Sequence, residues 1–168
     1  MRLLRDYQRA DFARVCEIDR LCFEPGVAYS PAEMASILRR RAVALVIEKA
    51  HDGIVGFLVA HKTGRNRAHI VTVDVLPGYR KQGIGRELIL TCEEHLRAGG
   101  VKTVRLETAV SNKAAQALYE SLGYTFVRRV ARYYSNGEDA WVMEKHLGRS
   151  ETEQRGLPRA SRSSARAG

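Results

Sequence analysis

Apolar residues recur along this chain with two periods, and the changes of period separate predicted helices from predicted strands. The first helical stripe consists of Phe12, Val15, Cys16, Ile18 and Cys22. Their three- and four-residue spacing is typical of one helix face. Asp11 stands just before the stripe, where its carboxylate can cap the helix. Residues 30–33 read Ser-Pro-Ala-Glu, a capping box with proline at the first helical position, and predict a second helix.

Segments rich in valine, isoleucine and leucine predict strands in the rest of the chain. The predicted strands are residues 3–7, Ala42–Glu48, Ile54–His61, Ala68–Leu76, Thr103–Thr108, Tyr124–Arg132 and Ala140–Lys145. Two more helices, Gly83–Ala98 and Lys113–Leu122, are each followed by glycine. Strands separated by a helix are expected to run parallel, and strands joined by short turns antiparallel. The pattern predicts an α/β (α+β) fold, with a mixed sheet of about six or seven strands flanked by about four helices.

The periodic pattern ends near residue 147, so residues 1–147 are interpreted as one domain. Residues 148–168 are rich in arginine, serine, alanine and glycine, and Leu157 is their one aliphatic residue larger than alanine. Such a segment cannot bury enough apolar surface to offset the entropy of ordering the chain. We expect a disordered basic tail.

Composition favours a soluble cytoplasmic protein without a membrane partner. The chain has 168 residues, of which 45% are hydrophobic, as in ordinary globular proteins. No apolar run approaches the ~20 residues that a membrane helix requires. The charged start of the chain, Met-Arg-Leu-Leu-Arg, is unlike a signal peptide. No large apolar surface stripe is visible, which favours a monomer.

The cysteines and histidines give no sign of a metal site or a reactive thiol. The three cysteines form no CxxC pair, and the five histidines form no HExxH motif and no Cys/His cluster. We therefore expect no metal. Cys16 and Cys92 fall at apolar helix positions, where cysteine packs as a small hydrophobic residue, and all three are interpreted as buried structural thiols.

The formal net charge of +9 favours anionic partners. A polyphosphate cofactor, an acidic peptide and RNA all satisfy that condition, and charge alone does not choose among them. Aromatic residues are not interleaved with basic ones as in a single-stranded nucleic-acid platform, which argues against a nucleic-acid-binding protein.

The segment from Val73 to Arg86 carries the most specific chemistry. A strand ends there, a Pro-Gly turn and basic residues follow, and Gly83-Ile84-Gly85 opens a helix. Glycines let the backbone approach a ligand, and the first N–H groups of a helix bind phosphate oxygens. The third glycine of a dinucleotide-binding turn and the Gly-Lys-Ser/Thr of a P-loop are both missing. The segment predicts a pyrophosphate cradle, with an ordinary strand-to-helix turn as the alternative.

This segment resembles motif A of the GNAT acetyltransferases, Arg/Gln-x-x-Gly-x-Gly/Ala, with Arg80, Gly83 and Gly85 at the defining positions. Residues 104–124 resemble the next motif of that family, and residues 132–143 resemble the end of the RimI-like N-terminal acetyltransferases. The resemblance covers roughly residues 3–147. It implies a GNAT fold, in which parallel strands at Val73–Val75 and Thr103–Thr108 splay apart.

The resemblance implies that acetyl-CoA binds as co-substrate. The strand backbone would contact its acetyl and pantetheine parts, the turn and helix start would hold its pyrophosphate, and an asparagine would contact the pantetheine arm. The implied residues are Val73, Asp74, Val75, Arg80, Lys81, Gln82, Gly83, Ile84, Gly85, Arg86 and Asn112. Asn112 and its neighbour Ser111 also stand at a helix start, where either could be a cap.

Two residues match the family's general base and general acid, Glu107 and Tyr119. The base, directly or through water, would help an amine to lose its proton, and the acid would protonate the departing thiolate. No covalent enzyme intermediate is needed, so no reactive cysteine is required. Without the resemblance, Glu107 could be a strand carboxylate in a salt bridge, and Tyr119 could pack beside Leu118 and Leu122.

The resemblance is loosest around the acceptor. The walls of its groove would be formed by Phe23, Glu24, Tyr29, Tyr133 and Tyr134. Asp74 introduces a carboxylate into the acetyl-binding strand, where it would either line the acceptor cleft or pair with an arginine. We expect acetyl transfer in a ternary complex to the N-terminal α-amine of a protein or peptide, with a ribosomal protein as one candidate. The alternatives are a small-molecule amine, a lysine side chain, a nucleic-acid-binding protein, or an acetyl-CoA sensor without turnover.

Overall fold

A computed structural model describes residues 1–148, and the predicted tail lies outside the described residues from Arg149 onward. The helices are α1 (Phe12–Cys22), α2 (Pro31–Arg39), α3 (Ile84–Ala98) and α4 (Lys113–Ser121). The strands are β1 (Arg2–Asp6), β2 (Val43–Lys49), β3 (Gly53–Lys62), β4 (Arg67–Val75), β5 (Thr103–Ala109), β6 (Thr125–Val130) and β7 (Ala140–His146). Their order confirms the prediction, with two short 3-10 turns added, η1 (Arg9–Asp11) and η2 (Pro77–Tyr79).

The seven strands form one mixed sheet in the order β1-β2-β3-β4-β5-β7-β6. Strands β4 and β5 are the parallel pair among the described strands, and all other neighbours are antiparallel. Strand β7 lies between β5 and β6, so the last strand of the chain is internal and β6 is an edge. The predicted mixed sheet with a parallel pair is confirmed, whereas the insertion of β7 is not visible in the sequence pattern.

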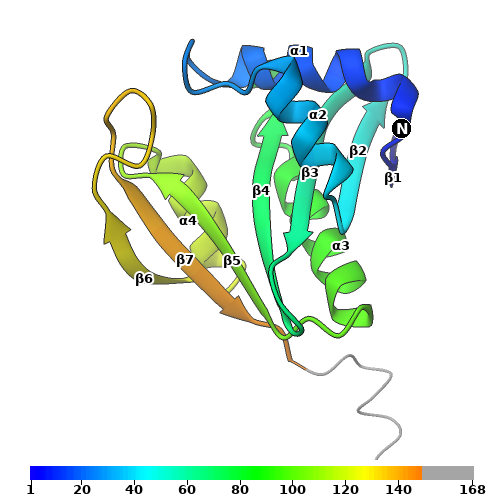
Figure 1. Ribbon diagram of the computed structural model, residues 1–168. Helices are drawn as coiled ribbons and strands as arrows, with labels where there is room; N and C mark the ends of the chain where they lie inside the picture. Colours follow the sequence, from blue (N-terminus) through cyan, green and yellow to red (C-terminus); the bar gives the residue numbers. More distant parts are fainter. Residues whose placement is uncertain (149–168) are drawn as a thin grey trace, which may run out of the picture.

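The parallel strands β4 and β5 separate after a short paired stretch (Figure 1). Their pairing covers only Arg67–His69 and Thr103–Arg105, although β4 continues to Val75 and β5 to Ala109. Backbone groups beyond the paired stretch therefore have no partner across this gap. The splayed strands expected from the family resemblance are confirmed.

Helices cover both faces of the sheet, and each face has its own apolar core. On one face, α1 and α2 contribute Val15, Ile18 and Met34 to a core with Phe57 of β3. On the other face, α3 and α4 pack over a larger core. The sheet thus forms a middle layer, and the open ends of β4 and β5 face the loops that join the helices to it.

A β-bulge in β4 changes which way its side chains point. Ala60 pairs with Ile70 but Val59 pairs with Thr72, so Val71 is an extra residue. Before the bulge, Ile70 belongs to the α3 core, and after it Val73 and Val75 pack there instead. The bulge turns Asp74 toward the opposite face, where α1 lies.

The start of α2 is built as predicted. The Ser30 hydroxyl accepts a hydrogen bond from the Glu33 N–H at 3.2 Å, and the Glu33 carboxylate accepts one from the Ser30 N–H at 2.7 Å. This capping box fixes the point at which the α1–α2 loop (residues 23–30) becomes a helix.

The predicted cap of α1 is wrong. The Asp11 side chain makes no capping bond to α1. It instead accepts hydrogen bonds from the Gln8 N–H at 2.7 Å and from both terminal nitrogens of Arg5. Because η1 precedes α1, Asp11 is the third residue of that short turn and faces back toward its start.

The described residues contain no helix that is both long and apolar enough to span a bilayer. The cysteines are all free. Cys92 is buried, but Cys16 and Cys22 are only half-buried, which corrects the prediction that all three are buried.

Candidate functional site

Two cavities meet where β4 and β5 separate. The larger has a volume of about 740 Å³ and the smaller about 400 Å³. They share the lining residues Cys22, Phe23, Val73, Asn112, Ala115 and Tyr119. A ligand in the smaller cavity and another in the larger one could therefore touch at this shared wall.

The smaller cavity gathers the predicted cofactor residues. It is lined by Val73, Asp74, Val75, Arg80, Lys81, Gly83, Ile84, Gly85, Arg86 and Asn112. Gln82 is the exception, since its side-chain amide donates to the Gly78 carbonyl at 3.4 Å and accepts from Lys49 at 3.3 Å. Its backbone carbonyl also accepts a bond from Arg2. Gln82 thus braces the turn from the outside.

The turn before α3 exposes a set of backbone N–H groups. Lys81 and Gly83 both have left-handed backbone angles, with φ of 58° and 78°. The first intrahelical bond runs from the Glu87 N–H to the Gly83 carbonyl, so the three preceding N–H groups have no helical partner. Gly83 is the N-cap and offers no side-chain acceptor. Such an arrangement suits phosphate oxygens, which makes the predicted pyrophosphate cradle chemically sound.

Close packing explains the second glycine of the motif. A Cβ at Gly85 would lie 3.3 Å from Leu118 of α4 and 3.9 Å from Val75 of β4. A side chain at this position would therefore require Leu118 to shift.

Arg80 holds the end of β4 to the turn. Its Nε donates to the Val75 carbonyl at 2.9 Å, and the Cys22 thiol reaches the same oxygen at 3.4 Å. Burial raises the pKa of Cys22 to about 11, so the thiol stays protonated at neutral pH. Cys22 lines both cavities, but it is not a thiolate nucleophile.

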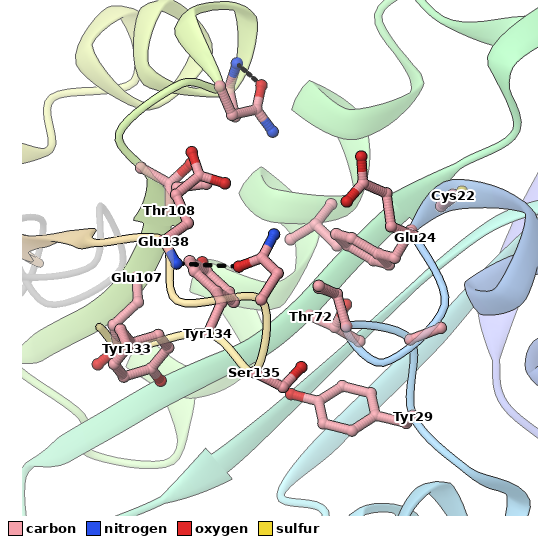
Figure 2. Close-up of a pocket in the computed structure, with 18 of the residues that line it drawn as sticks. Cys22, Glu24, Tyr29, Thr72, Glu107, Thr108, Tyr133, Tyr134, Ser135 and Glu138 are labelled. Atoms are coloured by element: carbon pink, nitrogen blue, oxygen red, sulfur yellow. Dashed lines mark hydrogen bonds between the residues drawn. The ribbon is translucent and has the colours of Figure 1, made fainter. Parts of the chain in front are cut away.

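The larger cavity lies between the splayed strands, the α1–α2 loop (residues 23–30) and the β6–β7 loop (residues 131–139). It gathers the predicted groove residues Phe23, Glu24, Tyr29, Tyr133 and Tyr134. Figure 2 shows Tyr133 and Tyr134 on the side of Glu107, with Tyr29 and Glu24 across the cavity. The two loops touch, because the Ser135 hydroxyl donates a hydrogen bond to the Gly26 carbonyl. This hydrogen bond therefore connects the two loops that form opposite walls of the cavity.

Glu107 lies on the wall of the larger cavity with its side chain only 8% exposed. Its Oε2 forms a hydrogen bond with Nε2 of His69, and its Oε1 lies 3.3 Å from Nε of Arg105. The alternative interpretation as an ion-paired strand carboxylate is thus present in the structure. The carboxylate also faces the cavity, so both descriptions hold together. No sequence pattern links His69 to Glu107, because only the β4–β5 register brings the two residues together.

Tyr119 stands at the junction of the two cavities. It is 8% exposed, and its ring packs edge-on against Tyr124 at 6.0 Å between centroids. Burial raises the pKa of Tyr119, and the nearby Asp74 carboxyl adds to that effect. The hydroxyl therefore keeps its proton at neutral pH and is available as a proton donor.

Asp74 faces another carboxyl group, which contradicts both predicted roles. Its side chain is buried, lies next to the equally buried Asp19 of α1, and accepts a hydrogen bond from the Thr72 hydroxyl. The Tyr29 N–H donates to Asp19 at 2.7 Å. Asp74 is therefore neither an open acceptor-cleft carboxylate nor the ion-pair partner of an arginine, because the bulge in β4 directs it into the α1 interface.

The two buried aspartates are placed so that they can share a proton. Burial raises the pKa of Asp74 well above its ordinary value, and burial raises that of Asp19 as well. Among the described residues, buried Asp19 Oδ1 and Asp74 Oδ2 have no hydrogen-bond partner. A proton between two such carboxyls satisfies both oxygens and avoids burying two adjacent negative charges.

Asn112 has the capping role that its position allowed. Its Oδ1 accepts a hydrogen bond from the Ala115 N–H at 3.1 Å at the start of α4. Its side chain also lines both cavities, so its amide N–H₂ remains as a donor toward a ligand. Within residues 1–148, no group of three or more His, Cys, Asp or Glu side chains is arranged to hold a metal ion.

Comparison with known proteins gives one family match. Residues 12–124 match the family described as acetyltransferase (GNAT). N-alpha-acetyltransferase 30 of Xenopus laevis is 39% identical over 98 residues, which is 58% of this chain but only 36% of that protein. This chain thus spans about a third of the length of that relative.

Two further similar proteins are matched over most of their length. N-alpha-acetyltransferase RimI of Mycobacterium tuberculosis is 31% identical over 144 residues, covering 83% of this chain and 89% of that protein. The crystal structure of the ribosomal-protein-S18-alanine N-acetyltransferase from Escherichia coli superposes with a TM-score of 0.78 at 27% identity. That superposition covers 89% of this chain and 96% of that one.

Proposed function

This chain belongs to the acetyltransferase (GNAT) family, and on that premise we propose that it transfers an acetyl group from acetyl-CoA to the N-terminal α-amine of a protein or peptide. The observation that carries the proposal is the meeting of a phosphate-type cradle and a loop-walled cleft at Tyr119. The names of the relatives, which are N-alpha-acetyltransferases, support the α-amine as acceptor.

The smaller cavity is the proposed acetyl-CoA site. The free N–H groups at the start of α3 suit the pyrophosphate, and Arg86 and Lys81 add positive charge beside them. The unpaired edge of β4 from Val73 to Val75 offers backbone groups to the pantetheine arm, as does the Asn112 amide. When bound there, acetyl-CoA supplies an acetyl group activated as a thioester.

Glu107 and Tyr119 are the proposed base and acid. Glu107 takes a proton from the acceptor ammonium, directly or through one water, so that the amine lone pair becomes nucleophilic. Tyr119 gives its hydroxyl proton to the sulfur that leaves. Each role suits the group's surroundings, since Glu107 faces the larger cavity and burial keeps Tyr119 protonated.

The acceptor occupies the larger cavity in this proposal. A protein α-amine has an ordinary pKa of ~8, against ~10.4 for lysine, so it is more easily deprotonated near neutral pH. The similarity to an enzyme named for ribosomal protein S18 makes the N-terminus of a ribosomal protein a candidate acceptor to test first.

A binding and turnover experiment tests the proposal in two steps. Calorimetry with acetyl-CoA compares the wild type with Gly83→Glu, which places a carboxylate in the cradle. Gly53→Glu is the matched control, because Gly53 also has a positive φ but lies at the start of β3, directly after the β2–β3 turn. Thiol release is then measured with peptides that have free or blocked N-termini, with free lysine and with small amines.

The expected result is micromolar binding that Gly83→Glu loses and Gly53→Glu keeps, followed by thiol release only with free N-termini. Release with blocked, lysine-containing peptides or small amines would move the acceptor to one of those classes. Absence of acetyl-CoA binding by the wild type would contradict the proposal at its base.

A further inference from the structure

His69 contacts Glu107 but has no role in the proton transfer proposed above. His69 is the last residue of β4 that pairs with β5, just where the two strands separate. Its Nε2 forms a hydrogen bond with Oε2 of Glu107 across the strand pair. The His69 side chain is 21% exposed and that of Glu107 only 8%. The histidine is therefore the more exposed partner of the pair.

This contact constrains where the proton lies between His69 and Glu107. Two acceptor atoms would repel at hydrogen-bond distance, so a proton must lie between Nε2 and Oε2. With Glu107 ionised, His69 is the donor and Glu107 Oε2 the acceptor. The other oxygen, Oε1, accepts no hydrogen bond from Arg105. Arg105 Nε lies 3.3 Å from it but makes no hydrogen bond within the described residues. Oε1 therefore keeps acceptor capacity for a ligand in the cavity.

Few other groups near this pair can change charge near neutral pH. Arg105 is permanently charged. Burial raises the pKa values of Tyr29, Tyr133 and Tyr134, which keeps these tyrosines neutral. The remaining candidate is His61 of β3, the cross-strand neighbour of His69, whose Nε2 is hydrogen-bonded to the Ile37 carbonyl.

Resting on the function proposed above, we propose that His69 is the positioning residue of Glu107. Neutral His69 donates Nε2–H to Oε2 and leaves Oε1 to receive the proton of the acceptor ammonium. The N–H bond of the ammonium breaks, an O–H bond forms on Oε1, and the amine keeps the electron pair for attack. Glu107 later releases the proton to water. A proton added to Nδ1 of His69 places a positive charge beside the carboxylate and makes Glu107 a weaker base.

The test is the pH dependence of kcat/KM with one peptide. Ionisation of the acceptor amine gives log(kcat/KM) a slope of about 1 below pH ~8. Protonation of His69 weakens Glu107 as a base, so it adds a further unit of slope on the acidic side of the profile. His69→Gln still donates an N–H but cannot ionise, so the steepening disappears while the high-pH rate stays within about threefold. His69→Ala loses about tenfold or more at high pH, where His69 of the wild type is neutral, because Oε2 loses its donor.

His61→Gln is the matched control, since it removes the neighbouring imidazole without touching Glu107, and it keeps the steepening. A His69→Gln profile as steep as that of the wild type overturns the inference. So does a His69→Ala variant as active as the wild type.

Nitrogen-15 NMR of the histidine rings gives a readout that does not depend on activity. The signal of His69, assigned by its loss in His69→Gln, should report the Nε2–H tautomer, and Glu107→Leu should abolish that preference. An active wild type without the tautomer overturns the role of His69 alone. A wild type that shows the tautomer but acetylates no amine overturns the proposed function, and the role of His69 falls with it.

Discussion

Tyr119 shows how burial alone prepares a side chain for one chemical role. Its hydroxyl lies where the two cavities join, and its raised pKa keeps the proton on the oxygen until it is needed. Asp74 contributes to that raised pKa from the α1 side of β4. The protonation state of Tyr119 is thus determined by its neighbours as much as by its residue type.

Replacing Tyr119 with phenylalanine should lower kcat by about 100-fold, because the leaving sulfur loses its proton donor. Acetyl-CoA affinity should stay within about twofold, since the ring and its contact with Tyr124 are kept. Steady-state kinetics and calorimetry measure the two effects. Tyr7→Phe removes a half-buried hydroxyl on the other side of the molecule and is the control. An unchanged kcat would remove Tyr119 from the mechanism.

Replacing Asp74 with asparagine should change how stability depends on pH. The folded-state pKa of Asp74 lies above its unfolded value, so protonated Asp74 stabilises the fold most at low pH. That contribution is lost as pH rises from about 4 through the raised pKa. The wild type should therefore lose free energy of unfolding relative to Asp74→Asn as pH rises. Urea denaturation at several pH values checks this, and a constant difference between the two proteins would contradict the shared proton.

At the scale of elements, two loops and two strands together form the proposed acceptor cleft. The α1–α2 loop ends at the capping box of Ser30, and the β6–β7 loop carries Tyr133 to Ser135. The hydrogen bond from Ser135 to Gly26 ties these loops together over the cavity. Loop position, which no single element fixes, therefore decides how wide the cleft is.

Breaking this tie should affect the acceptor more than the co-substrate. Ser135→Ala should raise the KM for a peptide about threefold with little change in kcat, because the loops must be ordered on binding. Acetyl-CoA affinity should not change. Ser121→Ala, which removes an exposed hydroxyl bonded to Leu118 within α4, serves as the control. A fall in kcat without a change in KM would mean that the contact acts on chemistry and not on the acceptor.

At the scale of the whole molecule, the net charge of the chain and the charge of the larger cavity have opposite signs. The chain carries a net charge of +9, yet the larger cavity is lined by Glu24, Glu33, Glu107 and Glu138. Within the described residues, its lining contains no lysine, arginine or histidine. Hydrogen bonds lower the pKa values of Glu33 and Glu138, so both are ionised at neutral pH. The larger cavity is thus acidic although the chain as a whole is basic, and an acidic cavity suits a cationic acceptor.

Peptides with lysine after the first residue should therefore be better acceptors than peptides with glutamate there. We expect a difference of about tenfold in kcat/KM at low salt, reduced when the ionic strength is raised to about 1 M. Glu24→Gln should narrow the difference, because it removes one negative charge from the wall. Equal rates for both peptides at low salt would show that the acidic lining does not select the acceptor.

Local patterns determined most of what lies within single elements. The 3.6-residue and two-residue periods predicted every helix and strand in order, and the capping box placed the start of α2. The glycine motif predicted the cradle because it is a contiguous segment whose backbone chemistry needs no distant partner. The family resemblance brought Glu107 and Tyr119 forward, and their proposed roles stay predictions.

Only the tertiary structure decided which distant side chains meet. The bulge at Val71 inverted the alternation of β4 and sent Asp74 to Asp19, and nothing in the local sequence pattern marks that extra residue. The parallel register set His69 against Glu107, although 38 positions separate them. A cross-strand contact depends on register and on where a strand slips by one residue. Both are settled by packing over the whole sheet, so the sequence named the parts of the site and the fold chose their partners.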